Sequence, residues 1–288
     1  MLVQIGCHLS VSKGFGQAVA RAHELGADVL QYFPKNPRSH RPKPVDREAC
    51  ARESQRAREE GFLSVAHSPY VTNLATPDDE LAKITVTSIV NDLEIAEAYG
   101  TPYVVVHCGR HMDQGREAGI RRMVELLNRI HERYRGPVQL LLENTAGQGS
   151  ELGTHLEELA EIRSRLEEPE RVGYCIDTCH AFAAGLLDFD QWDRFLELIQ
   201  QDGFLESVKV FHLNDSKFAA GSRRDRHAKL GQGTMGQAGL TRFLAEPLFQ
   251  SIPFILETPV EDEAEYGDEM RLARGWLAEF RGSSGGGD

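Results

Sequence analysis

The sequence predicts a single (β/α)8 TIM barrel, and three observations support this fold class. Eight short apolar runs recur along the 288 residues, and amphipathic segments with helical spacing separate them. The runs are apolar at almost every position, as expected of parallel strands that are covered on both faces. Eight alternating units favour closure into a barrel over the alternative, an open doubly wound sheet.

The predicted strands and helices alternate from end to end. In chain order the strands cover residues 2–7, 29–33, 62–66, 103–106, 138–142, 172–176, 208–211 and 254–256. Apolar residues fall at i, i+3, i+4 and i+7 in the segments that begin at Phe15, Val86, Ile120 and Trp192. Five glycines follow predicted helices and precede strands, where a left-handed residue commonly ends a helix: Gly26, Gly61, Gly100, Gly136 and Gly203.

The composition is typical of a soluble globular enzyme, with 41% hydrophobic and 26% charged residues. No apolar stretch is long enough to span a bilayer, and the N-terminus has neither the basic segment nor the cleavage site of a signal peptide. Five cysteines without a C-x-x-C pair indicate reduced thiols in a cytoplasmic protein. We predict a monomer with one domain over residues 1–282, followed by a flexible tail over 283–288.

Whole-chain charge does not decide the partner. A net charge of −12 argues against broad nonspecific binding to nucleic acid. Positive charge is nevertheless concentrated in two stretches: Lys35, Arg38, Arg41 and Lys43, and then Lys217, Arg223, Arg224, Arg226 and Lys229. Three divalent cations, for which the reasons follow, would bring the net charge to about −6. The first basic stretch lies in a proline-rich loop, residues 34–44, which is either disordered or a binding loop.

The residues at the ends of the predicted strands carry the chemical signal. In chain order they are His67, His107, Glu143, Asp177, His212 and Glu257, and nearby loops add His180, Asp225 and His227. All strands of a barrel open at their C-terminal ends on one rim, where the active site lies. Any one of these residues alone would more often cap a strand. Four carboxylates and five histidines on one rim, however, would repel one another or stay unsatisfied without cations.

Histidine and carboxylate ligands without cysteine suit zinc, with manganese or iron as partial substitutes. Nine ligands are too many for one ion and too few to close three tetrahedral shells, so positions for water or substrate should remain open.

Four motifs, in this order, resemble endonuclease IV, the zinc-dependent family of apurinic/apyrimidinic endonucleases in base-excision repair. They are ENTAGQGS at 143–150, DTCHAFAAG at 177–185, HLNDSK at 212–217 and DRH at 225–227. The similarity extends from Gly6 to Pro259, nearly the whole chain. The resemblance implies a DNA repair hydrolase that cleaves the phosphodiester 5′ to an abasic site in double-stranded DNA. The products would be a 3′-hydroxyl and a 5′-deoxyribose phosphate, and blocked 3′ ends are a second implied substrate.

The resemblance also implies how three zinc ions per chain would be held. His67, His107 and Glu143 would bind the first. Glu143 would bridge to the second, bound also by Asp177, His212 and Glu257, and the third would lie between His180, Asp225 and His227. The catalytic carboxylates would be Glu143, Asp177 and Glu257. A bridging carboxylate holds two cations about 3.5–4 Å apart, where a shared water becomes a nucleophile, and a third cation can stabilise the departing oxygen.

Two loops resemble the family's loops that enter the base stack. FPKNPRS at 33–39 implies that Arg38 inserts, and HSPYVTNL at 67–74 implies that Tyr70 and Val71 fill the gap beside the lesion. Family members often carry leucine where this chain has Val71, so the wedge here is smaller. The alternative for these residues is ordinary packing within their loops.

Two other functions fit parts of the pattern. A metal-dependent sugar isomerase or epimerase would use the same barrel with carboxylates and histidines at the rim, but likeness of fold is weak evidence for function. A non-catalytic metal or nucleic-acid binding protein would need closed, commonly cysteine-rich metal shells. Asp225, His227 and the basic loop 34–44 favour the nuclease, because a small sugar needs none of them.

Overall fold

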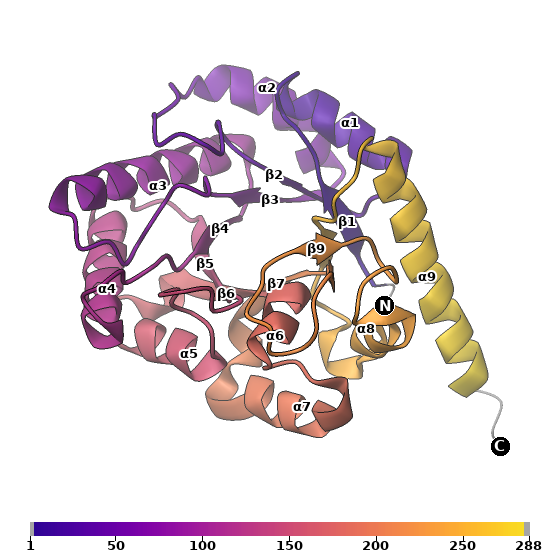
Figure 1. Cartoon of the computed structure of the whole chain (residues 1–288). Coiled ribbons are helices and arrows are strands. Elements are labelled where there is room, and N and C mark those ends of the chain that lie inside the picture. The colour runs from indigo at the N-terminus through magenta and orange to yellow at the C-terminus, as the bar shows by residue number, and fades with distance from the viewer. Residues whose placement is uncertain (1–2, 285–288) are drawn as a thin grey trace.

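A computed structural model describes residues 3–284, and within them eight parallel strands close into one barrel with helices around it (Figure 1). The order around the barrel is β1, β10, β7, β6, β5, β4, β3, β2. The strands are β1 (Ile5–His8), β2 (Val29–Tyr32), β3 (Leu63–His67), β4 (Tyr103–His107), β5 (Gln139–Glu143), β6 (Val172–Asp177), β7 (Val208–His212) and β10 (Phe254–Leu256). The predicted closed barrel is therefore confirmed, and the doubly wound sheet is excluded.

The strand boundaries differ from the prediction mainly at the carboxyl ends. Strands β3 to β7 each run one residue further than predicted and end on the polar residue itself. A short antiparallel hairpin, β8 (Asp215–Ser216) and β9 (His227–Ala228), was not predicted, because two-residue strands have no readable alternation. Residue 2 of the predicted first strand lies outside the described part of the chain.

The helices form the outer layer of the barrel in Figure 1. Their bounds are α1 (Phe15–Leu25), α2 (Arg47–Glu59), α3 (Asp79–Tyr99), α4 (Arg116–Arg133), α5 (Leu156–Ser164), α6 (Thr178–Ala184), α7 (Trp192–Gln200), α8 (Gly236–Ala245) and α9 (Ala264–Ser284). Short 3-10 turns cover Pro169–Arg171, Phe189–Gln191, Gln201–Gly203, Leu205–Ser207 and Pro247–Phe249. Across residues 3–284 no helix is long and apolar enough to cross a membrane.

The core has two layers because successive strand residues face opposite sides of the sheet. Inside the barrel one buried cluster consists of Val29, Val65, Val105, Leu141, Cys175, Val210 and Ile255. The alternate strand residues, such as Leu30, Ala66 and Phe211, face outward and pack in the larger cluster with the helices. Burial of a side chain such as valine or leucine contributes about 1.5–3 kcal/mol, so both layers hold the rim in a fixed position.

Four of the five glycines predicted to be left-handed are so. Gly26 and Gly100 cap α1 and α3 at φ 76° and 78°, and Gly61 and Gly203 also have positive φ. The prediction for Gly136 is wrong: it does not lie in the left-handed region. Helix α4 ends three residues earlier, and a Cβ at Gly136 would lie 2.3 Å from the hydroxyl oxygen of Tyr134, so close packing requires the glycine.

The C-terminal boundary also differs from the prediction. Helix α9 continues through Ser284, so the first two residues of the predicted flexible tail, 283 and 284, belong to this helix. The hydroxyl of Ser283 donates to the carbonyl of Phe280 at 2.8 Å, as in a continuing helix. Residues 285–288 lie outside the described part of the chain.

Candidate metal centre

The structure brings the nine predicted side chains together at the carboxyl-terminal rim. Five are the last residues of their strands, and Glu257 directly follows β10. They form three groups, in each of which the ligand-type atoms lie within 4.8 Å of one another: His67, His107 and Glu143; Glu143, Asp177, His212 and Glu257; and His180, Asp225 and His227. These groups coincide with the three sets that the resemblance implied. Cys179, which was not predicted as a ligand, forms an overlapping group with Asp177 and His227.

Glu143 lies at the centre and is fully buried. Its Oε2 atom is 3.1 Å from Nε2 of His67 and 3.0 Å from Nε2 of His107. Its Oε1 atom is 3.1 Å from Nδ1 of His212 and 3.4 Å from Nδ1 of His180. Strand register produces this, because His107 on β4 is paired with Glu143 on β5. One carboxylate therefore faces two groups of imidazoles with its two oxygens.

The second group surrounds His212, which pairs with Asp177 across β6 and β7. Nδ1 of His212 is 3.1 Å from Oε2 of Glu257 and 3.9 Å from Oδ2 of Asp177. Oxygens of three carboxylates, Glu143 included, thus converge on one imidazole nitrogen.

The third group depends on the β8–β9 hairpin. Pairing of Ser216 with His227 folds the long loop after β7 back toward the rim. Oδ1 of Asp225 then lies 3.3 Å from Nε2 of His180 and 3.5 Å from Nε2 of His227. Two residues remote in sequence from His180 therefore complete a site with it.

Backbone and amide oxygens fix the orientation of four imidazoles. Nδ1 of His67 is 2.8 Å from the carbonyl of Ser68, and Nδ1 of His180 is 2.9 Å from the carbonyl of Asn144. Nε2 of His212 is 2.8 Å from Oε1 of Gln31, and Nδ1 of His227 is 3.1 Å from the carbonyl of Glu257. A carbonyl only accepts, so each ring donates there. In a neutral ring the other nitrogen then points its lone pair at a carboxylate, the usual arrangement of a metal-binding histidine.

This donor set fits divalent cations. Nε2 of His227 is buried, has no hydrogen-bond partner, and lies 3.5 Å from Asp225 and 3.7 Å from Asp177. A lone pair facing a carboxylate is repulsive unless the ring takes a proton or a cation lies between them. Imidazole nitrogens and carboxylate oxygens together are the ligands that zinc and related ions prefer.

The pKa directions show how strongly the groups depend on one another. Burial raises the pKa of the Glu143 carboxyl, but the charges of His107 and His212 outweigh this and hold the pKa well below its usual value. Burial lowers the pKa of His107, and the charge of Glu143 outweighs it in the opposite direction. Burial likewise raises the pKa of Asp225, and His180 reverses the shift. Glu143 and Asp225 therefore favour the ionised form, which the positive charge around them stabilises.

Several supporting residues were not predicted from the sequence. Gln31 is fully buried, and its Nε2 atom donates to Oε1 of Glu257 at 2.6 Å and lies 3.0 Å from Nδ1 of His8. Asn214 donates to Oδ2 of Asp177 at 2.6 Å. The available signals were a glutamine inside an apolar strand and an asparagine within a motif. Neither signal shows which ligand the side chain supports.

The predicted DNA-contacting residues lie on exposed parts of the two loops beside the metal groups. Arg38 is exposed, Tyr70 is 62% exposed, and Val71 is 38% exposed. The two loops are joined, because the backbone N–H of Tyr70 donates to the carbonyl of Pro37 at 3.0 Å. The Tyr70 ring also contacts Phe33 of the other loop, with ring centroids 5.0 Å apart.

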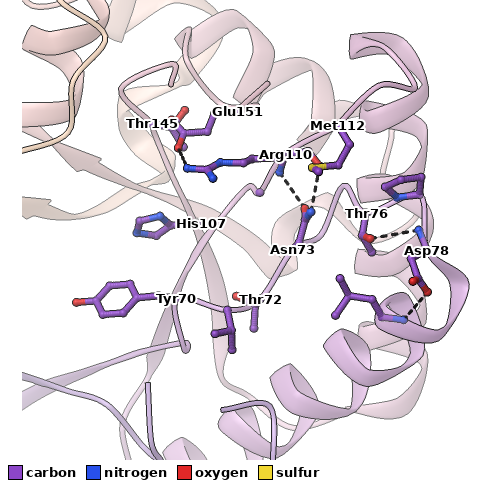
Figure 2. A pocket seen from close by; sticks show the side chains of 14 residues that line it. Tyr70, Thr72, Asn73, Thr76, Asp78, His107, Arg110, Met112, Thr145 and Glu151 are labelled. Carbon is purple, nitrogen blue, oxygen red and sulfur yellow. Dashed lines mark hydrogen bonds and ion pairs between the residues drawn. The ribbon is translucent and has the colours of Figure 1, made fainter. Parts of the chain in front are cut away.

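A cavity of about 530 Å³ opens next to Tyr70 and is also lined by His107 and Met112. Figure 2 shows the rings of Tyr70 and His107 on the same side of this cavity. Further along the same loop, the side chain of Asn73 bonds to both the N–H and the carbonyl of Arg110, at 2.9 and 3.1 Å, and so ties the loop after β3 to the loop after β4. The rim is therefore open beside the first metal group.

Comparison with known proteins identifies the family. The chain is 53% identical over 275 residues to a probable endonuclease 4 of Symbiobacterium thermophilum, covering 96% of this chain and 100% of that protein. The chain belongs to the endonuclease IV family. A family model described as a xylose isomerase-like TIM barrel matches residues 19–279.

Solved structures agree with this family. The crystal structure of endonuclease IV from Thermus thermophilus is 37% identical, has a TM-score of 0.81, and is matched over 96% of this chain and 99% of that one. A D-tagatose 3-epimerase-like protein has a TM-score of 0.72 at 18% identity, over 98% of this chain and 99% of that one. At that identity the second likeness shows the shared fold alone.

Proposed function

We propose that this chain is a metal-dependent DNA repair endonuclease that hydrolyses the phosphodiester 5′ to an abasic site in duplex DNA, leaving a 3′-hydroxyl and a 5′-deoxyribose phosphate. The observation that carries the proposal is Glu143, whose two oxygens face two different groups of ligand-type side chains. Two adjacent metal groups that share a carboxylate suit in-line displacement at phosphorus. The relatives named endonuclease 4 support the same activity.

Zinc is the proposed cofactor, with three ions per chain and partial substitution by manganese or iron. The three groups of imidazole and carboxylate atoms support this count and this choice. Cations bound there would supply a nucleophile from water near neutral pH and would balance the charge that develops on the phosphate and the leaving oxygen.

The protein's own contribution is to hold the proposed catalytic carboxylates, Glu143, Asp177 and Glu257, in place before the substrate arrives. Asn214 fixes Asp177, and Gln31 fixes Glu257 through hydrogen bonds of 2.6 Å in each case. These hydrogen bonds hold the two carboxylates in defined orientations, which lowers the reorganisation that catalysis requires.

DNA would lie across the two exposed loops. We propose that Arg38, Tyr70 and Val71 enter the base stack and occupy the space beside the extruded abasic nucleotide. Exposed basic residues at 223, 224 and 226 flank Asp225 and would contact phosphates. Such local positive charge offsets the net charge of −12 where the backbone lies.

The same centre would remove blocking groups from 3′ ends. Those groups are also joined to the 3′ oxygen of DNA through a phosphate ester, which the same hydrolysis would cleave. We propose that the enzyme acts as a monomer in the cytoplasm, where its substrate is found. Its five cysteines, all free and buried, suit a reducing compartment.

The test uses a labelled duplex with one tetrahydrofuran abasic analogue, incubated with and without a chelator. We expect a single cut 5′ to the analogue, loss of cleavage in the chelator, and recovery when zinc is returned. Glu143→Gln should abolish cleavage. Glu158→Gln, a change at a buried glutamate outside the three groups, should retain it. Epimerisation of a ketose by the wild-type protein, without cleavage of the duplex, would overturn the proposal.

A further inference from the structure

A buried ion pair lies beneath the two loops that carry Arg38 and Tyr70. Nζ of Lys35 is 2.7 Å from Oδ1 of Asp92, and the two side chains are 3% and 0% exposed. Lys35 belongs to loop 34–44 and Asp92 to helix α3. The charge of Lys35 is therefore internal and already balanced, unlike the exposed Arg38 three residues later.

The same turn of α3 holds both loops. Nζ of Lys35 also donates to the carbonyl of Ser88 at 2.5 Å. On the other loop, the hydroxyl of Ser68 donates to Oδ2 of Asp92 at 3.2 Å. At the far end of loop 34–44, the side chain of Asn91 bonds to both the N–H and the carbonyl of Lys43, at 2.8 and 2.9 Å. These contacts argue against the disordered alternative for this loop.

Burying this pair is costly. Burial raises the pKa of Asp92 to about 6 even with Lys35 beside it, and burial lowers the pKa of Lys35. Apolar side chains of similar volume commonly stabilise a protein as well as a buried ion pair does, or better. A buried ion pair can instead specify a single geometry, because its two charges cannot separate freely in a buried site.

We infer that Lys35 and Asp92 are positioning residues that fix the two wedge loops for distortion of DNA, an inference that rests on the proposed function. Neither side chain contacts DNA directly in this arrangement, because the two are only 3% and 0% exposed. Arg38 lies three residues beyond Lys35, and Tyr70 lies two residues beyond Ser68, so each exposed side chain is close to a residue that is fixed to α3. A side chain that separates stacked nucleobases must resist being displaced, and the fixed loop residues give that resistance.

The deciding variant removes both charges. Asp92→Asn alone would leave the ammonium of Lys35 unpaired and should lower stability as well as DNA binding. The double variant Lys35→Met, Asp92→Leu places apolar groups of similar size in the same space, so stability should return while the anchor stays absent. Asp28→Asn, at a carboxylate whose side chain is 44% exposed, is the control for loss of a paired aspartate elsewhere in the fold. That carboxylate pairs with Arg274 and accepts from the N–H of Ile5, at the start of β1 and away from the rim.

The metal-loaded wild-type and variant proteins would be assayed on the same duplex. This duplex carries an abasic analogue beside 2-aminopurine, whose fluorescence reports unstacking. For the double variant we expect a thermal midpoint within about 4 °C of wild type, and kcat/KM on bis(p-nitrophenyl) phosphate within about twofold. The KM for the lesion duplex should rise about tenfold or more, and the fluorescence rise at saturation should be smaller. Without DNA, amide exchange over residues 36–43 and 68–72 should be faster.

A double variant that recovers stability, lesion KM, fluorescence and amide protection together would overturn the inference, because the pair would then only stabilise the fold. Failure of the wild-type protein to cleave the lesion duplex would instead refute the proposed function. In that case the exchange measurement still decides whether the pair fixes the loops.

Discussion

Replacement of Gln31 by methionine tests whether the second metal group depends on support from outside its ligands. Methionine has nearly the same volume and removes only the amide. The change removes a hydrogen bond of 2.6 Å to the Glu257 carboxylate and leaves the ring N–H of His212, now 2.8 Å from Oε1 of Gln31, unpaired in a buried site. Hydrogen bonds to charged groups contribute about 1.5–3 kcal/mol, and an unsatisfied buried donor costs about 1–3 kcal/mol.

Part of this free energy is lost from folding and part from metal binding. We therefore expect about a 10- to 100-fold weaker affinity for one ion, the range found for residues that support metal ligands. The assay equilibrates protein in a series of zinc buffers and measures bound metal by elemental analysis. Gln139→Met is the control, since that glutamine begins β5 and bonds to the carbonyl of Glu170 instead of to a ligand. Titration curves for Gln31→Met and wild type that superimpose would refute the reasoning.

Four further predictions can be checked separately. Protein purified without chelator should carry about three metal ions per chain, and full activity with one ion or fewer would contradict the trinuclear centre. The double variant Arg38→Ala, Tyr70→Ala should keep its metals but bind lesion DNA more weakly, since the unstacking cost of a few kcal/mol is no longer offset; unchanged preference for lesion over intact duplex would show that the wrong loops were chosen. Val71→Leu should preserve or tighten lesion binding, measured by fluorescence anisotropy, if this position is a wedge. Burial lowers the pKa of His131 to about 4, so the unfolded chain takes up a proton first as pH falls, and stability should be lost between roughly pH 6.5 and pH 4.

The His131 effect has a defined size and control. From pH 7 to pH 5 the residue should cost about 2 kcal/mol of unfolding free energy. His131→Gln should lack this part of the pH dependence, and urea titrations at both pH values measure the difference. Loss of metal at low pH affects both proteins alike and cancels in the comparison. Equal pH dependence in the two proteins would show that His131 is not the group responsible.

The clustering of the nine side chains at the rim was predictable from the sequence because a barrel converts position along the chain into position in space. A polar residue such as His107 or Glu143 at the end of an apolar strand must reach the same rim as its counterparts on the other strands. Asp225 and His227 were predictable only as a motif, since the hairpin that returns them to the rim consists of strands two residues long.

Supporting residues were not predictable for a different reason. Gln31 stands in an apolar strand, and only its neighbours from β7 and β10 show that it bonds to His212 and Glu257. Lys35 counted as surface charge in the sequence, although a partner 57 positions away buries it. Both cases depend on pairs of residues that meet only after the chain folds. The spacing of apolar and polar residues along the sequence does not indicate such pairs.

The three metal groups differ in their access to solvent, and this has a kinetic consequence. Glu143 and His212 are fully buried, whereas Asp225 and His227, from the hairpin, have side chains 35% and 19% exposed, and His107, in the first group, is 29% exposed. Ions held by the hairpin group and by the first group would therefore exchange with the medium before an ion held around His212. A chelator would strip the two outer groups first, and the partly loaded enzyme would keep its ion at the buried second group.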